Sequence, residues 1–149
     1  MDTTPHGELV ELLRDGLRLS SSHVNARLRS IWPHLRAPQH GSDRDKLVAL
    51  FRHAGYVSDG PASPKDERPI FQGRLALSEP SISWTLNQAV ATKYARGYTT
   101  VGDTEVWQAK APPAAVLAQF AADEEIVVDP ALLKAVKRLG YFRHLARPI

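Results

Sequence analysis

The sequence predicts an α+β fold in which helices come first and a mixed, small-sheet region follows. Two observations favour this class. Apolar residues recur at helical spacing through residues 5–55, and from Pro69 onward short strand-like segments alternate with short helices. Between these parts, residues 57–69 are rich in Pro, Gly, Asp and Ser, which is typical of a loop or linker.

Length and composition fit one globular domain. The chain has 149 residues, 43% hydrophobic and 23% charged, and no apolar run approaches the roughly 20 residues that cross a bilayer. No secretory signal is predicted at the N-terminus, and the lack of cysteine excludes disulfides, thiolate catalysis and zinc–cysteine sites. We expect one integrated cytoplasmic domain over residues 1–149, with a helical part at 1–56, a β-rich core at 69–149, no metal and no membrane partner.

Three apolar stripes predict three helices in the N-terminal part. Serines at 20–22 break the first stripe from the second, and Ser42 with Asp43 is a candidate cap for the third helix. The stripes consist of Leu9, Leu12, Leu13 and Leu17, then Val24, Leu28, Ile31, Trp32 and Leu35, then Leu47, Leu50, Phe51 and Ala54.

The second part predicts strands and short helices in alternation. Asn87 is a candidate N-cap and Gly97 a candidate terminator of one helix, and Asp129 followed by Pro130 is typical of another helix start. In chain order we expect strands over 69–75 and 82–86, a helix over 87–95, a strand over 104–111, a helix over 114–120, a strand over 124–128, a helix ending at 139, and an edge strand at Tyr141 and Phe142.

Positive charge gathers at the C-terminus of a chain whose net charge is +3. The residues from 131 to 149 contain no acid and five cations, which are Lys134, Lys137, Arg138, Arg143 and Arg147. We interpret them as a solvated helix face whose cations lie where the helix dipole favours them. A nucleic-acid or acidic partner is the alternative interpretation.

Three features of the second part carry polar residues suited to catalysis. Arg74 lies on an early strand, Ser83 and Thr85 share one face of the next, and Glu125 opens a strand rich in β-branched residues. Singly, each has an ordinary explanation as a surface charge, a half-buried sheet position or an acidic loop that leads into the core. Their combination and order favour a functional interpretation.

An arginine strand, a Ser-x-Thr strand and a carboxylate-led strand, in this order, resemble the R-S-E class of ADP-ribosyltransferases. Residues 82–85 (Ile-Ser-Trp-Thr) and the helix at 91–95 (Ala-Thr-Lys-Tyr-Ala) are similar to a bacterial and phage branch of that family. Residues 106–118 look like its next strand and helix, and residues 125–130 like its closing glutamate strand. The resemblance covers about residues 69–130 and implies a split β-sheet sandwich that binds NAD.

The resemblance implies roles for the polar residues. A planar guanidinium holds phosphate oxygens in two parallel hydrogen bonds, which would be the role of Arg74 toward the NAD pyrophosphate. Cleavage of the nicotinamide–ribose bond passes through a cation-like sugar, which Glu125 would stabilise. Ser83 would orient Glu125 or the ribose, with support from Thr85.

The sequence departs from the family pattern at the expected arginine. The family's aromatic-arginine-glycine triplet reads Phe71-Gln72-Gly73 here, so a neutral glutamine occupies the arginine position. Arg74 follows two residues later on the same strand face, about 7 Å along the strand. Arg74 is the candidate to bind the phosphates instead, with Gln72 and Gly73 beside it at the NAD site. If Arg74 does not substitute, NAD binding would weaken and the fold would be catalytically degraded.

Aromatic and acidic residues complete the expected site. The ring of Tyr94 is the candidate to stack on nicotinamide, and Trp84 is a weaker one because it alternates to the opposite face of its strand. Asp123 stands two residues before Glu125, where relatives that modify arginine carry Glu or Gln, so it is the candidate acceptor-binding residue. Glu124 should face away from the site.

Two functions are therefore open. The first is transfer of ADP-ribose from NAD to an intracellular protein or nucleic acid, as a bacterial toxin or defence protein or a phage effector, with a neutralising antitoxin as a candidate partner. The second is a catalytically degraded fold that acts as a nucleic-acid- or protein-binding module. Arg27, Arg29 and Arg36, on or near one helix, would serve that second function.

Overall fold

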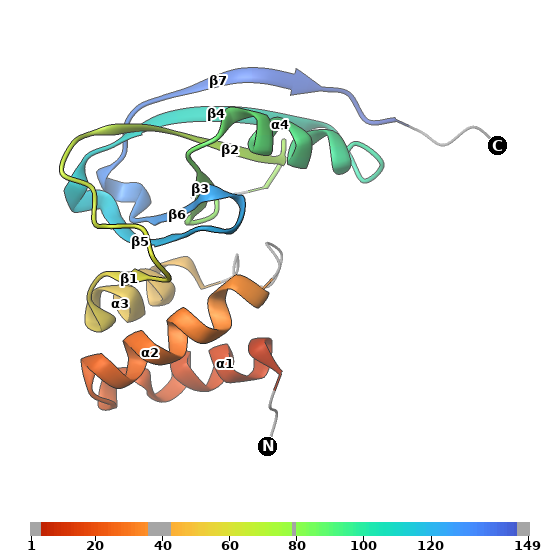
Figure 1. Cartoon of the computed structure of the whole chain (residues 1–149). Helices are drawn as coiled ribbons and strands as arrows, with labels where there is room; N and C mark the ends of the chain where they lie inside the picture. The colour runs from red at the N-terminus through yellow and green to blue at the C-terminus, as the bar shows by residue number, and fades with distance from the viewer. Residues whose placement is uncertain (1–3, 36–42, 79, 146–149) are drawn as a thin grey trace.

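The computed structural model describes residues 4–35, 43–78 and 80–145 and has the predicted α+β class (Figure 1). Three helices come first and most of the sheet follows. The helices are α1 (Pro5–Asp15), α2 (Ser21–Ile31) and α3 (Arg44–Ala54), and a 3-10 turn, Trp32–His34, follows α2. We call these helices and this turn the helical lobe. Thr4 and Ser20 cap α1 and α2 by accepting from the backbone N–H groups of Gly7 and His23.

Among the described residues, seven strands form one sheet with the order β1-β5-β6-β3-β2-β4-β7. Neighbouring strands are antiparallel except β1 and β5, which are parallel. The strands are β1 (Val57–Ser58), β2 (Arg68–Leu75), β3 (Ser83–Thr85), β4 (Thr104–Ala111), β5 (Val116–Phe120), β6 (Glu125–Val128) and β7 (Lys134–Phe142).

The sheet is narrowest between β2 and β3. These strands share one register pair, Phe71 with Thr85, whereas β2 and β4 pair continuously from Arg68 opposite Ala111 to Leu75 opposite Thr104. Beyond Phe71 the two strands diverge. The sheet therefore has an opening between its two halves, and polar side chains of both strands reach it.

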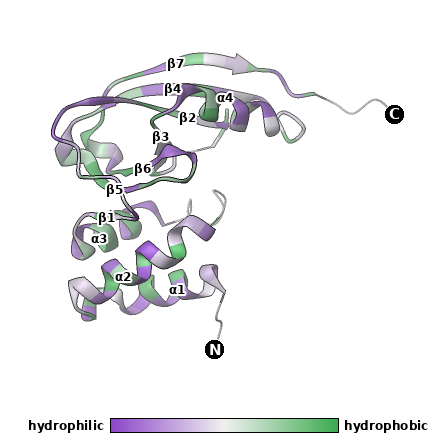
Figure 2. Cartoon of the chain, in the orientation of Figure 1, coloured by the Kyte–Doolittle hydropathy of each residue, from purple (hydrophilic) through white to green (hydrophobic). Residues whose placement is uncertain are grey.

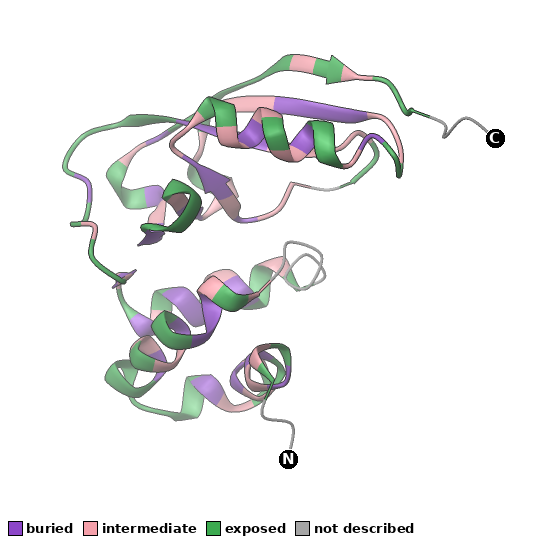
Figure 3. Cartoon of the chain, turned by 45° about the vertical axis from the view of Figure 1, so that its right-hand side comes forward, coloured by how far each residue is buried: buried purple, intermediate pink, exposed green. Residues whose placement is uncertain are grey.

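The helical lobe packs on the half of the sheet that contains β1, β5 and β6 (Figure 1). Its helices carry hydrophobic and hydrophilic segments side by side, as Figure 2 shows, and their buried faces turn inward (Figure 3). One apolar cluster joins the lobe to Val57, Leu117, Phe120 and Val127 of the sheet. A second cluster lies on the opposite face of the sheet and includes Ile70, Trp84, Ala109, Ile126 and Val128.

Helix α4 (Gln88–Gly97) confirms the predicted helix after the Ser-x-Thr strand. The side chain of Asn87 caps it by accepting from the backbone N–H of Ala89. The helix lies directly on β2, where a Cβ built on Gly73 would stand 2.2 Å from the backbone oxygen of Ala91. Phe71 and Val106 pack against the same helix. Gly73 is therefore needed so that α4 can approach the sheet.

The predicted helix over 114–120 is wrong. A 3-10 turn, Pro113–Ala115, leads into strand β5, whose residues Leu117, Ala118, Gln119 and Phe120 are all buried. A strand covered on both faces has no alternating polar pattern, so its apolar run cannot be distinguished from a short helix by periodicity.

The predicted helix from Pro130 to residue 139 is also wrong. Only one 3-10 turn, Pro130–Leu132, follows the Asp129 cap, and strand β7 then pairs with β4 along the sheet edge. Alanine, leucine and lysine favour helices, but pairing with the exposed edge of β4 overrides that preference. Lys134, Lys137 and Arg138 therefore lie on an edge strand, and their interpretation as a helix face does not hold. The predicted edge strand at Tyr141 and Phe142 is part of β7.

Smaller differences concern individual positions. Leu17 belongs to a 3-10 turn after α1 and is largely exposed, whereas Leu13 and Leu35 are partly buried. Asp43 precedes α3 without a side-chain capping bond, and Ser42 and Arg36 lie outside the described residues. The segment 57–69 contains the short strand β1. In the part of the chain that the structure describes, no helix is long and apolar enough to cross a membrane.

Candidate active site

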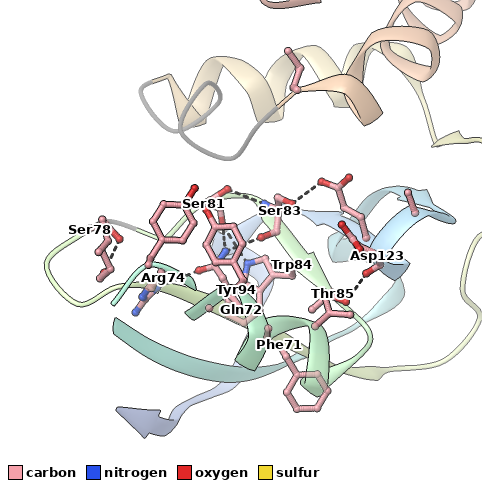
Figure 4. Close-up of a pocket in the computed structure, with 18 of the residues that line it drawn as sticks. Phe71, Gln72, Arg74, Ser78, Ser81, Ser83, Trp84, Thr85, Tyr94 and Asp123 are labelled. Carbon is pink, nitrogen blue, oxygen red and sulfur yellow. Dashed lines mark hydrogen bonds between the residues drawn. The ribbon is translucent and has the colours of Figure 1, made fainter. Parts of the chain in front are cut away.

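A pocket of about 400 Å³ lies between the helical lobe, the opening in the sheet and α4 (Figure 4). This volume is in the range of small-ligand sites. The sequence-predicted site residues all line it: Gln72, Gly73, Arg74, Ser83, Trp84, Thr85, Tyr94, Asp123 and Glu125. Residues far apart in the chain therefore meet at one place, although their chemical roles remain predictions.

Ser83 and Glu125 form the centre of the pocket. Strands β3 and β6 are antiparallel neighbours, with Ser83 opposite Val127 and Thr85 opposite Glu125, so the side chains of Ser83 and Glu125 share one face. The Ser83 hydroxyl donates to Oε2 of Glu125 at 2.5 Å. The hydroxyl thus fixes the direction of the carboxylate.

A second donor to Glu125 comes from the helical lobe. The indole Nε1 of Trp32 donates to the same Oε2 at 2.9 Å. Trp32 is buried, and its ring meets that of Phe51 edge-on with centroids 4.9 Å apart. Sequence analysis placed Trp32 in the helix core and gave no sign of this contact.

The pKa of Glu125 is raised above its ordinary value. Burial is the main cause, because it disfavours the charged form. The hydrogen bonds from Ser83 and Trp32 oppose this shift, and the negative charges of Asp123 and Asp59 add to it. A carboxyl with a raised pKa in a cleft is typical of a functional site.

The turn before Glu125 is strained and held by Thr85. Asp123 and Glu124 have φ values of 56° and 47°, in the left-handed region that non-glycine residues rarely adopt. The Thr85 hydroxyl donates to the Asp123 carbonyl at 2.7 Å. Glu124 is exposed, as expected, and accepts from the side chain of Asn87 at 2.9 Å. Asp123 therefore stays at the pocket rim in a fixed backbone geometry.

Gln72 closes the gap between the diverging strands. Its side-chain amide donates to the carbonyl of Ser81 at 3.0 Å and to that of Ser83 at 2.8 Å. Gln72 is buried, and its amide satisfies the Ser83 carbonyl, which has no β2 partner because the strands share a single register pair. The residue that replaces the expected arginine thus has a structural role in this chain.

Arg74 lies beside Gln72 but does not contact Ser83 or Glu125 among the described hydrogen bonds. One of its terminal nitrogens donates to Oε1 of Gln72 at 3.4 Å, and its guanidinium lies 4.5 Å from the ring centroid of Trp107. Burial lowers the pKa of Arg74, and the charge of Glu105 partly offsets this effect. Its Nε is buried and has no hydrogen-bond partner among the described residues.

Two tyrosines form the wall that α4 contributes. The rings of Tyr94 and Tyr98 lie 4.7 Å apart at an interplanar angle of 33°. Burial raises the pKa of Tyr94, and its hydrogen bond with Tyr98 adds to this shift. Trp84 packs in the cluster on the opposite face of the sheet, and its indole donates to the Ser81 carbonyl at 3.2 Å. This placement agrees with the strand alternation read from the sequence.

Some residues that line the pocket were not predicted as site residues from the sequence. They are Pro33, Leu35, Ser78, Ser81 and Tyr98. Tyr98 follows Tyr94 by one helical turn, a spacing that was visible in the sequence. No local signal pointed to the others. No group of three or more metal-binding side chains occurs among the residues that the structure describes.

Comparisons with known proteins give partial matches. No protein-family model matches the chain, and no solved structure matches it. The chain is similar to "Dual-action ribosomal maturation protein DarP" from Salmonella paratyphi B and from Salmonella newport, with 34% identity over 70 residues. The match covers 47% of this chain and 34% of the relative, so the chain spans about a third of the length of the curated relatives it matches.

Proposed function

We propose that this protein is an NAD-dependent ADP-ribosyltransferase with the split-sheet sandwich fold of the R-S-E class. The observation that carries the proposal is the Ser83–Glu125 hydrogen bond of 2.5 Å inside a pocket of about 400 Å³. The order of the three strands in the sequence and the opening between β2 and β3 support it.

Each end of an NAD molecule has a candidate partner in the pocket. Arg74 is a cation that lines the pocket, which suits a pyrophosphate. Tyr94 and Tyr98 offer ring faces for a planar base. Glu125 lies across the pocket as the acceptor for ribose hydroxyls. The polar groups thus match the phosphate, base and sugar of one ligand.

The proposed reaction breaks the bond between the nicotinamide nitrogen and the ribose C1′. The bonding electrons leave with nicotinamide, which departs as a neutral base, and positive charge develops on the sugar. The carboxylate of Glu125 stabilises this charge, and Ser83 holds it in place. A nucleophile of the acceptor, or water, then bonds to C1′ and loses its proton.

We infer an intracellular macromolecule as the acceptor, so that the protein would act in the cytoplasm as a toxin, defence protein or phage effector. Asp123 at the exposed rim is the candidate to contact the acceptor. A neutralising antitoxin is a candidate partner. The acceptor class is tested by incubating the protein with labelled NAD and a cell lysate and locating the label in protein, RNA, DNA or free ADP-ribose.

Nicotinamide release from NAD tests the activity itself. Glu125→Ala is expected to fold and to lose all turnover, while Glu124→Ala, which alters an exposed neighbour, serves as the matched control. Full activity of Glu125→Ala would disprove the proposed mechanism.

A second candidate function is binding to ribosomal RNA or ribosomal protein without catalysis. The partial similarity to a ribosomal maturation protein favours it, and so does the neutral Gln72 at the expected arginine position. Lys134, Lys137 and Arg143 offer positive charge. Salt-sensitive binding to ribosomal subunits together with no NAD turnover would support this function over the first.

A further inference from the structure

The hydrogen bond between Trp32 and Glu125 joins two parts of the chain that are 93 residues apart. Trp32 follows the last residue of α2, and Glu125 is the first residue of β6. Through this hydrogen bond the helical lobe directly contacts the carboxylate at the centre of the pocket.

Packing fixes the direction of the Trp32 indole. The side chain is 1% exposed and its ring meets Phe51 at an interplanar angle of 85°. A side chain whose rotamer is locked by packing can hold a partner within the narrow limits that a catalytic group requires. Both Trp32 and Ser83 donate to Oε2, so Oε1 lies outside this pair of hydrogen bonds.

Satisfaction of a buried indole does not by itself explain the contact. The buried indole of Trp84, on the opposite face of the sheet, instead donates to a backbone carbonyl, that of Ser81. A half-buried carboxylate is a costly partner for the same purpose, because burial penalises its charge. Trp32 and Glu125 are therefore better explained as a pair in which the lobe holds the carboxylate.

We propose that Trp32 is a positioning residue for Glu125, and that the helical lobe is through it a working part of the site. Trp32 orients the carboxylate and favours its charged form, because a hydrogen bond to the charged form of a group stabilises that form. The role of Glu125 in turnover rests on the function proposed above, whereas the contact between the two side chains does not.

Other charged and titratable groups lie around Glu125, and their charges affect its measured pKa. Asp123 precedes β6 and Asp59 follows β1, and both negative charges oppose ionisation of Glu125. Arg74 of β2 and Tyr94 of α4 line the same pocket. His34 lies in the same 3-10 turn as Trp32 and is exposed.

The test is an NMR titration of the Glu125 carboxyl carbon in the whole chain. Trp32→Phe keeps an aromatic ring against Phe51 and removes the N–H donor. We expect the pKa of Glu125 to rise in Trp32→Phe. Val24→Ala, which opens a cavity in α2 within the same lobe, is the matched control and should leave this pKa unchanged. An unchanged pKa in Trp32→Phe would overturn the proposal.

A second measurement needs no variant. In the wild-type protein the indole N–H resonance of Trp32 should shift with pH in step with the Glu125 carboxyl. Independent behaviour of the two resonances would overturn the proposal even if Trp32→Phe does not fold.

Kinetics add a readout that depends on the proposed activity. Trp32→Phe should lower kcat for nicotinamide release about tenfold, the loss expected for one hydrogen bond to a charged group, with little change in KM for NAD. The acid limb of its pH profile should move to higher pH. Absence of NAD turnover in the wild type would disprove the proposed function, while the titrations would still decide the role of Trp32.

Discussion

The hydroxyl of Ser83 donates to the carboxylate of Glu125 at 2.5 Å across two paired strands. The pairing of β3 with β6 brings these residues together although 42 positions separate them in the chain. This arrangement keeps a carboxylate with a raised pKa in a defined direction within the pocket. Burial of such a group lowers stability when it ionises, and the first prediction measures that effect.

Glu125→Gln should stabilise the protein at neutral pH and leave it unchanged in acid. Because the fold raises the pKa of Glu125 above its ordinary value near 4.5, the folded state holds the proton more tightly than the unfolded state. Its contribution to stability is therefore present below pH 4.5 and is lost as pH rises through the folded pKa. Glutamine cannot ionise and escapes this loss.

Urea unfolding at pH 4 and pH 8, compared between wild type and Glu125→Gln, gives the required free energies. The exposed neighbour Glu124→Gln is the control and should change the free energy of unfolding little at either pH. The same Glu125→Gln protein should lose NAD turnover by a factor of about 10² to 10⁴, as expected for removal of a charged catalytic group. An equal change in stability at both pH values would contradict the assigned burial of the charge.

Gly73→Ala should destabilise the protein by about 1–3 kcal/mol. The new Cβ would stand 2.2 Å from the backbone oxygen of Ala91 and 2.9 Å from the backbone nitrogen of Ala95, so α4 must move away from β2. Gly97→Ala, at the end of the same helix, meets no atom within 4 Å and is the matched control. Thermal unfolding of both variants checks the contrast. Equal melting temperatures for the two would show that α4 does not rest on Gly73.

Gln72→Ala and Arg74→Ala should affect different properties. Gln72→Ala leaves the Ser83 carbonyl without its donor and the Ser81 carbonyl with the Trp84 indole alone, and it should lower the free energy of unfolding by about 1–3 kcal/mol. Arg74→Ala removes the candidate phosphate anchor and should mainly raise KM for NAD. Steady-state kinetics of nicotinamide release and urea unfolding of both variants separate the two effects. A larger rise in KM for Gln72→Ala would place the phosphate anchor at Gln72.

The sequence predicted which polar residues lie together in the pocket better than it predicted the secondary structure around them. Arg74, Ser83 and Glu125 line one pocket, as predicted from short motifs that follow one another in a fixed order. Strand alternation places Ser83 and Glu125 on one face. Trp32 was not found as a site residue, because a contact over 93 positions leaves no local pattern and its helical spacing indicates a core role.

The errors in secondary structure have a common cause. Residues 116–120 and 134–142 form strands only because β6 and β4 offer edges to pair with, and such pairing over long sequence separation is invisible in a local window. The first segment is buried on both faces and the second is rich in helix-favouring residues, so neither alternates. By contrast, α4 has its own cap and amphipathic pattern and was predicted correctly.

Ala135→Gly distinguishes the strand β7 from the helix that its composition favours. Ala135 has φ of 50°, a left-handed conformation that costs an alanine about 1–2 kcal/mol and a glycine almost nothing. Glycine also loses more conformational entropy on folding than alanine, which offsets part of this gain. The net effect should be a variant more stable by about 0.5 kcal/mol. If residues 130–139 were helical, the same substitution would instead cost about 1 kcal/mol. Ala26→Gly, at an exposed position within α2, is the control and should show this helical cost. The changes in the free energy of unfolding, measured in urea, should therefore have opposite signs in the two variants if residues 134–142 form an edge strand. They should have the same sign if residues 130–139 are helical.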